Sequence, residues 1–428
     1  MGRLVFLVCL IYALLLLGLA TLDGRLVALA IPMMVFLLSA LYFAPGEVQI
    51  SITRSLSDNC VSTGIPVEVI TRITNTGAEL EEVLLEVDIP PGLELLKGET
   101  RVLAALPVNG INELSYTVRG SRGRHVFPEV RVSAVDQLGV FRRRKSFSAP
   151  AALLIKPQPW KLKPVPIRPR LAHGYTGFIP TRSGGAGVNF YGVREYQTGD
   201  PLRRINWKVT ARRDEEMFTN EFEQERITDV GLILDARQRT NIQVKEDSLF
   251  EHSVRATASL AEAFLHDGNR VGLLIYGRGR EMTFPGYGRV QLERILRSLA
   301  QAQSGDNQAL ESFVYLPTRF FPARSQIVFI SPLINDDLPV LISLRSYGYH
   351  ILVVSPDPFL FEGASYQPDV NQKLAIRLAR IERVLLLRKL QRAGVRVVDW
   401  PVVQPLNQVM HTALYRAAME NPVGGSGR

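Results

Sequence analysis

Hydrophobic residues gather into two long uncharged runs at the start of the chain, residues 4–20 and 26–44. A helix rises about 1.5 Å per residue, so each run is close to the length that spans a hydrocarbon core of about 30 Å. The short link between them, TLDGR, has turn chemistry, which predicts a transmembrane helical hairpin over residues 1–46. A secretory signal peptide is the alternative for the first run, although the second run would still anchor the product.

Basic residues near these runs predict the orientation. Arg3 precedes the first run, Arg25 lies in the link, and Arg54 follows the second run. The slight excess of positive charge outside the link favours both ends of the hairpin on the cytoplasmic side of the cell membrane. We therefore expect a multi-pass membrane protein with two helices and cytoplasmic soluble domains.

From residue 47 to 156 the pattern changes to short runs, such as VEVITRITNTG, in which apolar and polar residues alternate. A period of two predicts half-buried strands. Turn signals separate the runs at intervals typical of an antiparallel sandwich: Asn75-Thr76-Gly77, Pro90-Pro91-Gly92 and Asn109-Gly110. The segment is predicted to be an immunoglobulin-like β-sandwich that acts as a spacer, with ligand binding as the alternative.

Residues 157–189 are rich in proline and then in glycine, which predicts an extended linker. From 226 to 420, buried-strand runs alternate with helical periodicity, and a flexible tail follows at 421–428. The strand runs are 229–235, 271–276, 281–284, 326–331, 350–355 and 395–398, and the helical segments are 248–266, 288–303, 337–347, 369–393 and 406–420. This order predicts a doubly wound α/β domain with a largely parallel sheet.

The long helical segment 369–393 combines apolar residues with seven basic ones. We expect its apolar positions to pack on the sheet: Leu374, Leu378, Ile381, Leu385 and Leu390.

Composition narrows the functional classes. The formal charge of +9 is spread along the chain, which suits an acidic partner or an anionic membrane surface more than nucleic acid. The two cysteines, Cys9 and Cys60, are too few for a disulfide framework. The sequence has no phosphate-binding loop ending in Gly-Lys-Ser/Thr and no paired-cysteine zinc spacing, and its six histidines are isolated. We therefore expect no cofactor and no nucleic-acid ligand.

The segment 190–225 holds the candidate interaction residues. It contains REYQTGDPLRRINWKVTAR, with a tight turn at its Gly-Asp-Pro, and then the alternating stretch NEFEQE. Carboxylates on one face of a strand repel each other unless cations lie nearby, and the arginine fork suits that task. The candidate interaction residues are Arg194, Glu195, Tyr196, Gly199, Asp200, Arg203, Asn206, Trp207, Lys208, Arg212, Glu221 and Glu223.

The preferred interpretation of this segment is an ion-paired brace that holds an extension on the α/β sheet, with Trp207 packed beneath it. A docking surface for an acidic partner is the alternative. Catalysis is disfavoured, because no nucleophile–base pair accompanies the segment.

This segment, together with DQLGVF at residues 136–141, resembles the prokaryotic domain of unknown function 58 family over nearly the whole chain. The α/β order is similar to a von Willebrand factor type A domain. The resemblance implies a partner, a MoxR-type AAA+ ATPase, within a chaperone-like assembly system. It also raises the question of a divalent cation, which such domains often bind at the carboxyl ends of their strands.

The pattern for that cation is degenerate here. Asp235 is present, but Arg237 and Arg239 stand at the two serine positions, and Ser331 follows the later strand where an aspartate is usual. Hard cations prefer oxygen ligands and guanidinium groups repel them. We expect no metal, pairing of Asp235 with Arg237 or Arg239, a basic crevice, and Asp337 as a helix cap.

The sequence thus favours a non-enzymatic, membrane-anchored scaffold or adaptor that binds protein. A membrane-associated hydrolase or nuclease and a metal-dependent adhesion receptor are the alternatives, and the two arginines disfavour the receptor. The oligomeric state is left open.

Overall fold

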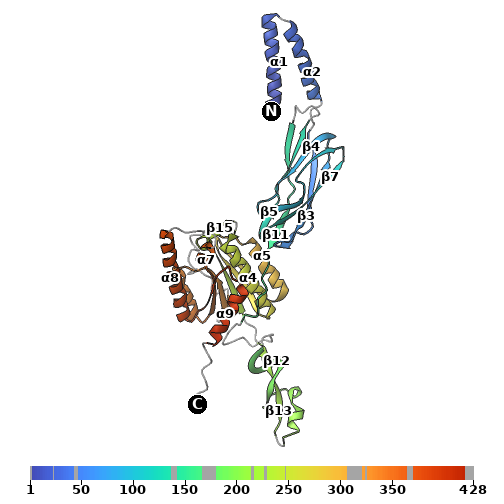
Figure 1. Cartoon of the computed structure of the whole chain (residues 1–428). Helices are drawn as coiled ribbons and strands as arrows, with labels where there is room; N and C mark the ends of the chain where they lie inside the picture. Colours follow the sequence, from blue (N-terminus) through green and yellow to red (C-terminus); the bar gives the residue numbers. More distant parts are fainter. Residues whose placement is uncertain are drawn as a thin grey trace. The chain divides into compact units, whose positions relative to one another are not determined.

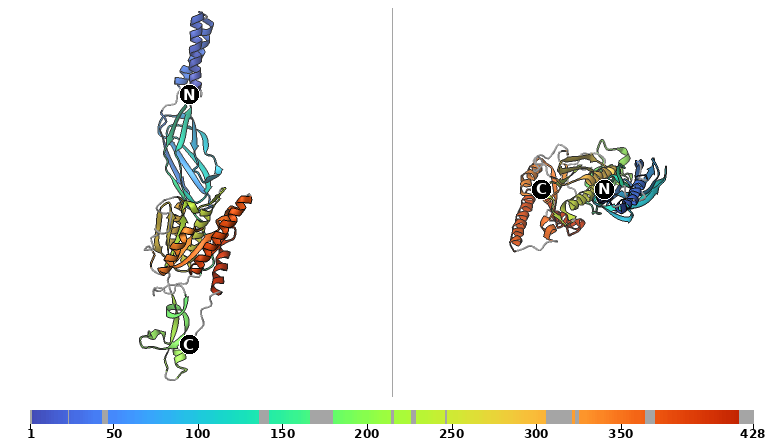
Figure 2. Two further views of the ribbon diagram at one scale, coloured as in Figure 1. Left: turned by 90° about the vertical axis from the view of Figure 1, so that its left-hand side faces the viewer. Right: turned by 90° about the horizontal axis from the view of Figure 1, so that it is seen from above.

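The computed structural model describes residues 2–22, 24–42, 47–135, 142–165, 180–213, 216–225, 229–245, 247–305, 321–322, 325–363 and 370–419. The chain divides into two units, Met1–Lys156 and Pro157–Arg428 (Figures 1 and 2). The predicted motif at 136–141 lies outside the described residues.

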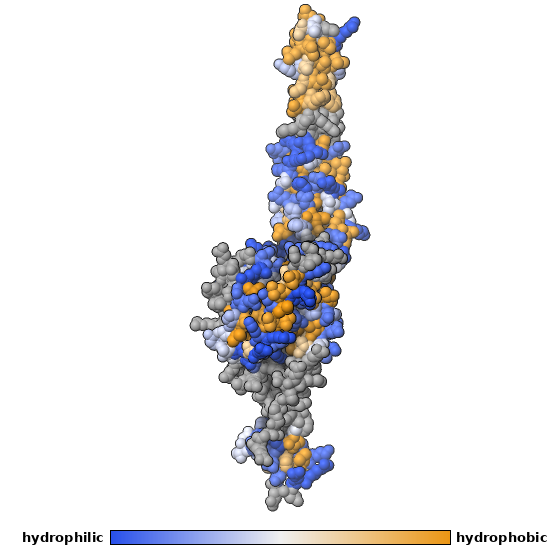
Figure 3. All heavy atoms as spheres, turned by 60° about the vertical axis from the view of Figure 1, so that its left-hand side comes forward, coloured by the Kyte–Doolittle hydropathy of each residue, from blue (hydrophilic) through white to orange (hydrophobic). Residues whose placement is uncertain are grey.

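The two apolar runs form helices α1 (Gly2–Thr21) and α2 (Gly24–Tyr42), which are hydrophobic along most of their length (Figure 3). They pack closely, since a Cβ added to Gly18 would lie 2.7 Å from Val27 Cγ2. Among the described residues, α2 is the helix whose length and apolarity suffice to cross a membrane, and the apolar part of α1 is the shorter Val5–Thr21. One or two membrane-spanning helices are therefore possible here, and the hairpin topology stays a prediction.

The predicted sandwich region consists of two four-stranded antiparallel sheets, ordered β1-β3-β7-β5 and β10-β9-β4-β6, and a three-stranded sheet β2-β11-β8. Residues Val69, Leu85, Val118 and Val132 come from both larger sheets and share one apolar core. The strands are β1 Ile50–Leu56, β2 Cys60–Ser62, β3 Val67–Asn75, β4 Leu80–Val87, β5 Leu93–Gly98, β6 Arg101–Leu106, β7 Ile111–Gly120, β8 Gly123–Val126, β9 Val130–Val135, β10 Arg142–Phe147 and β11 Ala152–Lys156.

Alternation explains this packing. Along β3, buried residues alternate with exposed or half-buried ones, as a strand with one face on a core requires. The immunoglobulin-like assignment of this region stays a prediction.

The first strands of the second unit are an antiparallel pair, β12 (Pro180–Glu195) and β13 (Phe218–Glu225). The predicted linker is therefore shorter in the structure, because residues 180–189 join β12 and pair with β13 through a ladder with register shifts. Glycine weakens a strand but does not forbid it when a partner strand supplies the hydrogen bonds. The connection contains a 3-10 turn, η1 (Leu202–Arg204), and the short helix α3 (Trp207–Thr210).

The rest of this unit is built on a six-stranded sheet of order β18-β17-β14-β19-β20-β21, in which β18 is antiparallel and the others are parallel. The expected largely parallel sheet is present, and it is Rossmann-like. Its strands are β14 Asp229–Ala236, β17 Arg270–Gly277, β18 Arg280–Gly286, β19 Gln326–Ile330, β20 His350–Pro356 and β21 Arg396–Trp400. Two-residue strands β15 (Gln243–Val244) and β16 (Asp247–Ser248) pair separately.

Helices cover both faces of this sheet, which is why its strands are buried on both sides. One core joins Leu232 and Leu234 of β14 to the first set of helices, and another joins Ile233 of β14 to the second set. The first set is α4 (Leu249–His266), α5 (Gly288–Gln301) and α9 (Leu406–Met419), and the second is α6 (Leu338–Ser346) and α8 (Val370–Arg392). Short elements complete the unit: η2 (Gln238–Thr240), η6 (Asn335–Asp337) and α7 (Pro358–Gly363).

The expectation for α8 was wrong for most of its apolar positions. Leu390 is buried as expected, but the sheet-facing side also holds Arg383, Leu386 and Leu387. The exposed side holds the other four predicted core residues, Leu374, Leu378, Ile381 and Leu385. The helix has two apolar faces, and periodicity alone could not decide which one meets the sheet.

The chain order of the strands creates a switch point. After β14 the chain builds β17 and β18 on one side, and it then returns to place β19 on the other side of β14. In open α/β sheets, ligands bind outside the carboxyl ends of the strands at such a point. The carboxyl ends of β14 and β19 therefore locate the candidate site.

Candidate functional site

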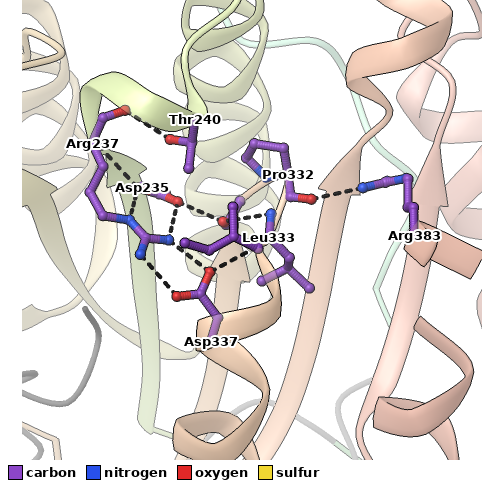
Figure 4. A network of polar contacts seen from close by, with 9 residues as sticks. Asp235, Arg237, Thr240, Pro332, Leu333, Asp337 and Arg383 are labelled. Carbon is purple, nitrogen blue, oxygen red and sulfur yellow. Dashed lines mark hydrogen bonds and ion pairs between the residues drawn. The ribbon is translucent and has the colours of Figure 1, made fainter. Parts of the chain in front are cut away.

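Asp235 lies near the carboxyl end of β14, and the chain turns immediately after it into η2 (Figure 4). The strand carries an unbroken run of buried residues up to Ala236, so the packed sheet fixes the position of this carboxylate. Ser331 follows the end of neighbouring β19, and its Oγ donates a hydrogen bond of 2.6 Å to Asp235 Oδ2. Register between the two strands thus brings together two polar groups 96 residues apart.

The side chain of Arg237 folds back onto Asp235. Arg237 Nε donates to Asp235 Oδ1 at 2.8 Å, and Nη2 donates to Asp235 Oδ2 at 2.7 Å. The other edge of the guanidinium faces Asp337, with Nη1 to Oδ1 at 2.9 Å and Nη2 to Oδ2 at 2.8 Å. The cation therefore lies between two carboxylates and binds both in the bidentate mode that suits its planar fork.

The loop after β19 is shaped to present Asp337. Leu333 has φ +60°, in the left-handed region that residues with a side chain rarely adopt. Its N–H donates to Ser331 Oγ at 3.0 Å, and the N–H of Ile334 donates to Asp337 Oδ2 at 3.1 Å. Asp337 is the N-cap residue of α6 by position, but its side chain makes no cap hydrogen bond to that helix and accepts instead from Ile334 at the start of η6. It also binds Arg237, a contact that its distance along the chain concealed.

Burial makes this network electrostatically strong. Asp235 and Arg237 are each 3% exposed and Asp337 is fully buried. Burial alone would lower the pKa of Arg237, but the hydrogen bonds and charges of Asp235 and Asp337 outweigh it and raise that pKa above the ordinary arginine value. The guanidinium stays charged, and the two buried carboxylates neutralise its charge inside the protein.

These contacts confirm that Asp235 pairs with Arg237. They correct the expectation that Arg237 makes the crevice basic, because this buried cation is outnumbered by two carboxylates. Arg239 is exposed. Within the described ranges, no group of three or more His, Cys, Asp or Glu residues could hold a metal ion. Metal-free function stays a prediction.

A second buried arginine stabilises the neighbouring strand ends. Arg383 projects from α8 and donates to Pro332 O at 2.7 Å, to Ser355 Oγ at 3.1 Å and to Asp399 Oδ1 at 2.7 Å. It thereby connects the loop after β19 to the ends of β20 and β21. Sequence reasoning missed this residue, because an arginine on a basic helix gives no sign that it is buried.

A pocket of about 300 Å³ lies beside the network, at the carboxyl edge of the sheet. Most of its wall is apolar, while Arg239, Glu382 and Arg383 bring charge to it. The apolar lining comes from the loops after β14 and β19, from the start of α7 and from α8: Ile242, Pro332, Leu333, Ile334, Pro358, Phe359, Ala379 and Leu386. This composition suits an apolar group that carries a charge at one end.

The signature segment forms a compact turn between β12 and β13. Arg194 Nη1 and Nη2 each lie 2.8 Å from an oxygen of Asp200, and the N–H of Gln197 donates to Asp200 Oδ2 at 3.0 Å. These bonds, first those from Arg194, lower the pKa of Asp200. Gly199 has φ +112°, which glycine adopts readily. The turn that the sequence predicted is therefore closed by an ion pair.

Other signature residues take structural positions along the same turn. Asn206 accepts from Val209 N at 3.1 Å, which caps α3, and it donates to Asn220 Oδ1 at 2.7 Å. The N–H of Tyr196 donates to Met217 O at 2.8 Å, joining the two strands. The remaining polar signature residues whose side chains are described are exposed: Glu195, Arg203, Lys208 and Arg212.

The placement of Trp207 was predicted wrongly. Its side chain is 66% exposed rather than packed beneath the arginines. It is the first residue of the single-turn helix α3, which is too short to cover an indole ring. The side chains of Glu221 and Glu223 lie outside the described residues, so the ion-paired brace stays a prediction.

The family described as "Protein of unknown function DUF58" matches residues 192–356, a span that holds both the signature turn and the buried ion network. The chain is also similar to the uncharacterized protein YeaD of Bacillus subtilis (strain 168). The identity is 28% over 224 residues, which is 51% of this chain and 54% of that relative. The match therefore spans about half the length of the relative.

Solved structures resemble parts of the chain weakly. The cupredoxin domain of amoB from Nitrosocaldus yellowstonii is 8% identical, with 29% of this chain and 98% of that chain covered and a TM-score of 0.20. A FixG-related protein from Vibrio parahaemolyticus is 9% identical, with 26% and 99% covered and a TM-score of 0.17. TM-scores this low carry no argument about fold or function.

Proposed function

We propose that the protein is a non-enzymatic, membrane-anchored scaffold or adaptor whose α/β unit binds another protein at the carboxyl edge of its sheet. The observation that carries this proposal is the ion network of Asp235, Arg237 and Asp337. The Arg237 guanidinium lies between the two buried carboxylates and forms an ion pair with each of them. Recognition is then left to the pocket beside them.

The pocket supports a protein ligand by its chemistry. Its wall is mainly apolar, and Arg239 is an exposed cation in the lining. A partner that inserts an apolar side chain and places a carboxylate near Arg239 would match both features. In a von Willebrand factor type A-like domain, such a contact would replace the metal-bridged carboxylate with a guanidinium-bound one.

A MoxR-type AAA+ ATPase is the partner to test, and the α1–α2 pair would hold the complex at the membrane. The soluble units then face the cytoplasm, where such an ATPase has access to nucleotide. Assembly or maturation of other protein complexes is the activity that this pairing would serve.

The test is capture of a purified MoxR-type ATPase by the full chain in detergent, measured by surface plasmon resonance. Arg239→Glu and Phe359→Ala alter the pocket and should each weaken binding about tenfold or more. Arg280→Glu is the matched control, since it reverses an exposed charge on β18 away from the pocket. Equal binding by all three variants and the parent would remove the pocket from consideration, and absence of binding by the parent would remove this partner.

A further inference from the structure

Helix α8 presents an apolar stripe on the side opposite the sheet. Leu374, Leu378, Ile381 and Leu385 are 69%, 60%, 57% and 50% exposed. Figure 3 brings the α8 side of Figure 1 forward and shows a hydrophobic patch there, set among hydrophilic side chains. Leucine and isoleucine that gather on one exposed surface are typical of an interaction site. The name "α8 stripe" is used below for these four residues.

The spacing of the stripe indicates the shape of its occupant. Its residues follow one another at intervals of four, three and four. At about 100° per residue they fall within a sector of roughly 60° on the side opposite the buried face. Val384, 44% exposed, lies beside this sector among the basic side chains. Alternating intervals of four and three residues are those of the a and d positions of a coiled-coil heptad, whereas helices that lie in a membrane surface usually carry aromatic residues on their apolar face, and the α8 stripe has none.

The charges beside the stripe indicate the chemistry of the occupant. On one flank, the same 100° rotation per residue places four basic side chains, and on the other it places Glu382 and Lys389. The whole helix holds seven basic residues and one acidic residue. The basic flank consists of Lys373, Arg377, Arg380 and Arg388, all exposed.

We propose that the α8 stripe binds an acidic amphipathic helix of a partner protein, in coiled-coil fashion. Leucine-rich positions of that helix would pack between Leu378 and Ile381, while its glutamates or aspartates would face the basic flank. A second copy of α8 is a poorer occupant, because pairing would bring strongly basic helices together. A lipid surface would match the charge but not the heptad spacing, and α8 has no aromatic residue to place at such a surface.

This inference shares with the proposed function the premise that the α/β unit binds protein, but it concerns a different surface. Variants of the stripe leave Arg239 and Phe359 in place, and variants of the pocket leave the stripe intact. Loss of one binding activity without the other therefore separates the two proposals.

The experiment uses the full chain in phosphatidylcholine nanodiscs, with empty nanodiscs as the blank. Two fluorescent four-heptad peptides share leucine at positions a and d and differ at e and g, which carry glutamate in one and lysine in the other. We expect fluorescence anisotropy to show that the glutamate peptide binds about tenfold or more tightly than the lysine peptide. Its affinity should fall as salt is added.

Two sets of variants test the stripe and its flank separately. Leu378→Ser with Ile381→Ser should abolish binding of the glutamate peptide, whereas Ala375→Ser, an exposed change on the same helix, should not. Arg377→Glu with Arg388→Glu should reverse the preference in favour of the lysine peptide. These positions are exposed, and unchanged tryptophan emission of each variant will report that the α/β unit is folded.

Several results would overturn the proposal. Equal affinity for the two peptides, or no binding of either at 100-fold excess, would exclude an acidic helix. Stripe-dependent binding to phosphatidylserine vesicles without peptide binding would identify a lipid surface instead. Stripe-dependent self-association in sedimentation would identify a second copy.

Discussion

Replacing Arg237 with methionine should destabilise the α/β unit by about 3–5 kcal/mol, because the change leaves two buried carboxylates without their cation. Methionine keeps much of the aliphatic volume, so little of the loss comes from a cavity. Four side-chain hydrogen bonds to Asp235 and Asp337 disappear, at 2.7–2.9 Å in the parent protein. For a unit of this size, the melting temperature should fall by roughly 10 °C.

Tryptophan emission is a selective assay for this loss. The chain has three tryptophans, and all lie in the second unit. Trp160 and Trp400 pack edge to face with ring centroids 5.9 Å apart, and Trp400 is 1% exposed. Urea unfolding followed by fluorescence therefore reports on the α/β unit while the sandwich and membrane helices stay silent.

A double-mutant cycle identifies the cause. Asp337→Asn in the Arg237→Met background removes one uncompensated charge, so the double variant should be more stable than the sum of the two single losses by about 1–3 kcal/mol. Arg280→Met, an exposed arginine in the same unit, is the control and should change stability by no more than about 0.5 kcal/mol. The reasoning is refuted if Arg237→Met unfolds within about 1 kcal/mol of the parent, or if the cycle is additive.

Two further predictions concern the ion network and the signature turn. Arg237→Ser should convert the site into a cation site lined by Asp235, Asp337 and Ser331. Mg²⁺ or Mn²⁺ should then raise the melting temperature of the variant and not of the parent. If neither cation changes the melting temperature of either protein, the guanidinium does not stand in the place of a metal. Asp200→Asn should speed hydrogen exchange at the Gln197 amide at pH 7. Because the pKa of Asp200 is lowered in the folded protein, its stabilising effect is present above the unfolded value of about 3.9 and is lost as the pH falls through the lowered value. After division by the intrinsic exchange rate at each pH, the Gln197 amide exchange rates of variant and parent should therefore converge in acid. A difference that persists there would contradict the hydrogen bond from the Gln197 N–H to the Asp200 carboxylate.

Local sequence patterns determined most of the architecture. Charge-free runs, period-two alternation and alternating strand and helix runs each reflect spacing along one element, which covalent geometry sets. They therefore predicted the apolar helices, the antiparallel region and the parallel sheet, and they located Asp235 and Arg237 at the end of β14. The pairing of Asp235 with Arg237 was also predictable, because the two residues are close together in the chain.

Tertiary structure decided what those residues meet. Asp337 reaches Arg237 across 100 positions because β19 lies beside β14, and strand order is a property of the whole sheet. Burial on the sheet selected one of the two apolar faces of α8, which left the α8 stripe exposed and brought Arg383 inside. Trp207 is exposed because the one-turn helix α3 is too short to cover an indole ring. Each outcome depends on which surfaces of different elements are buried against one another. The pattern of residues within one element does not report this.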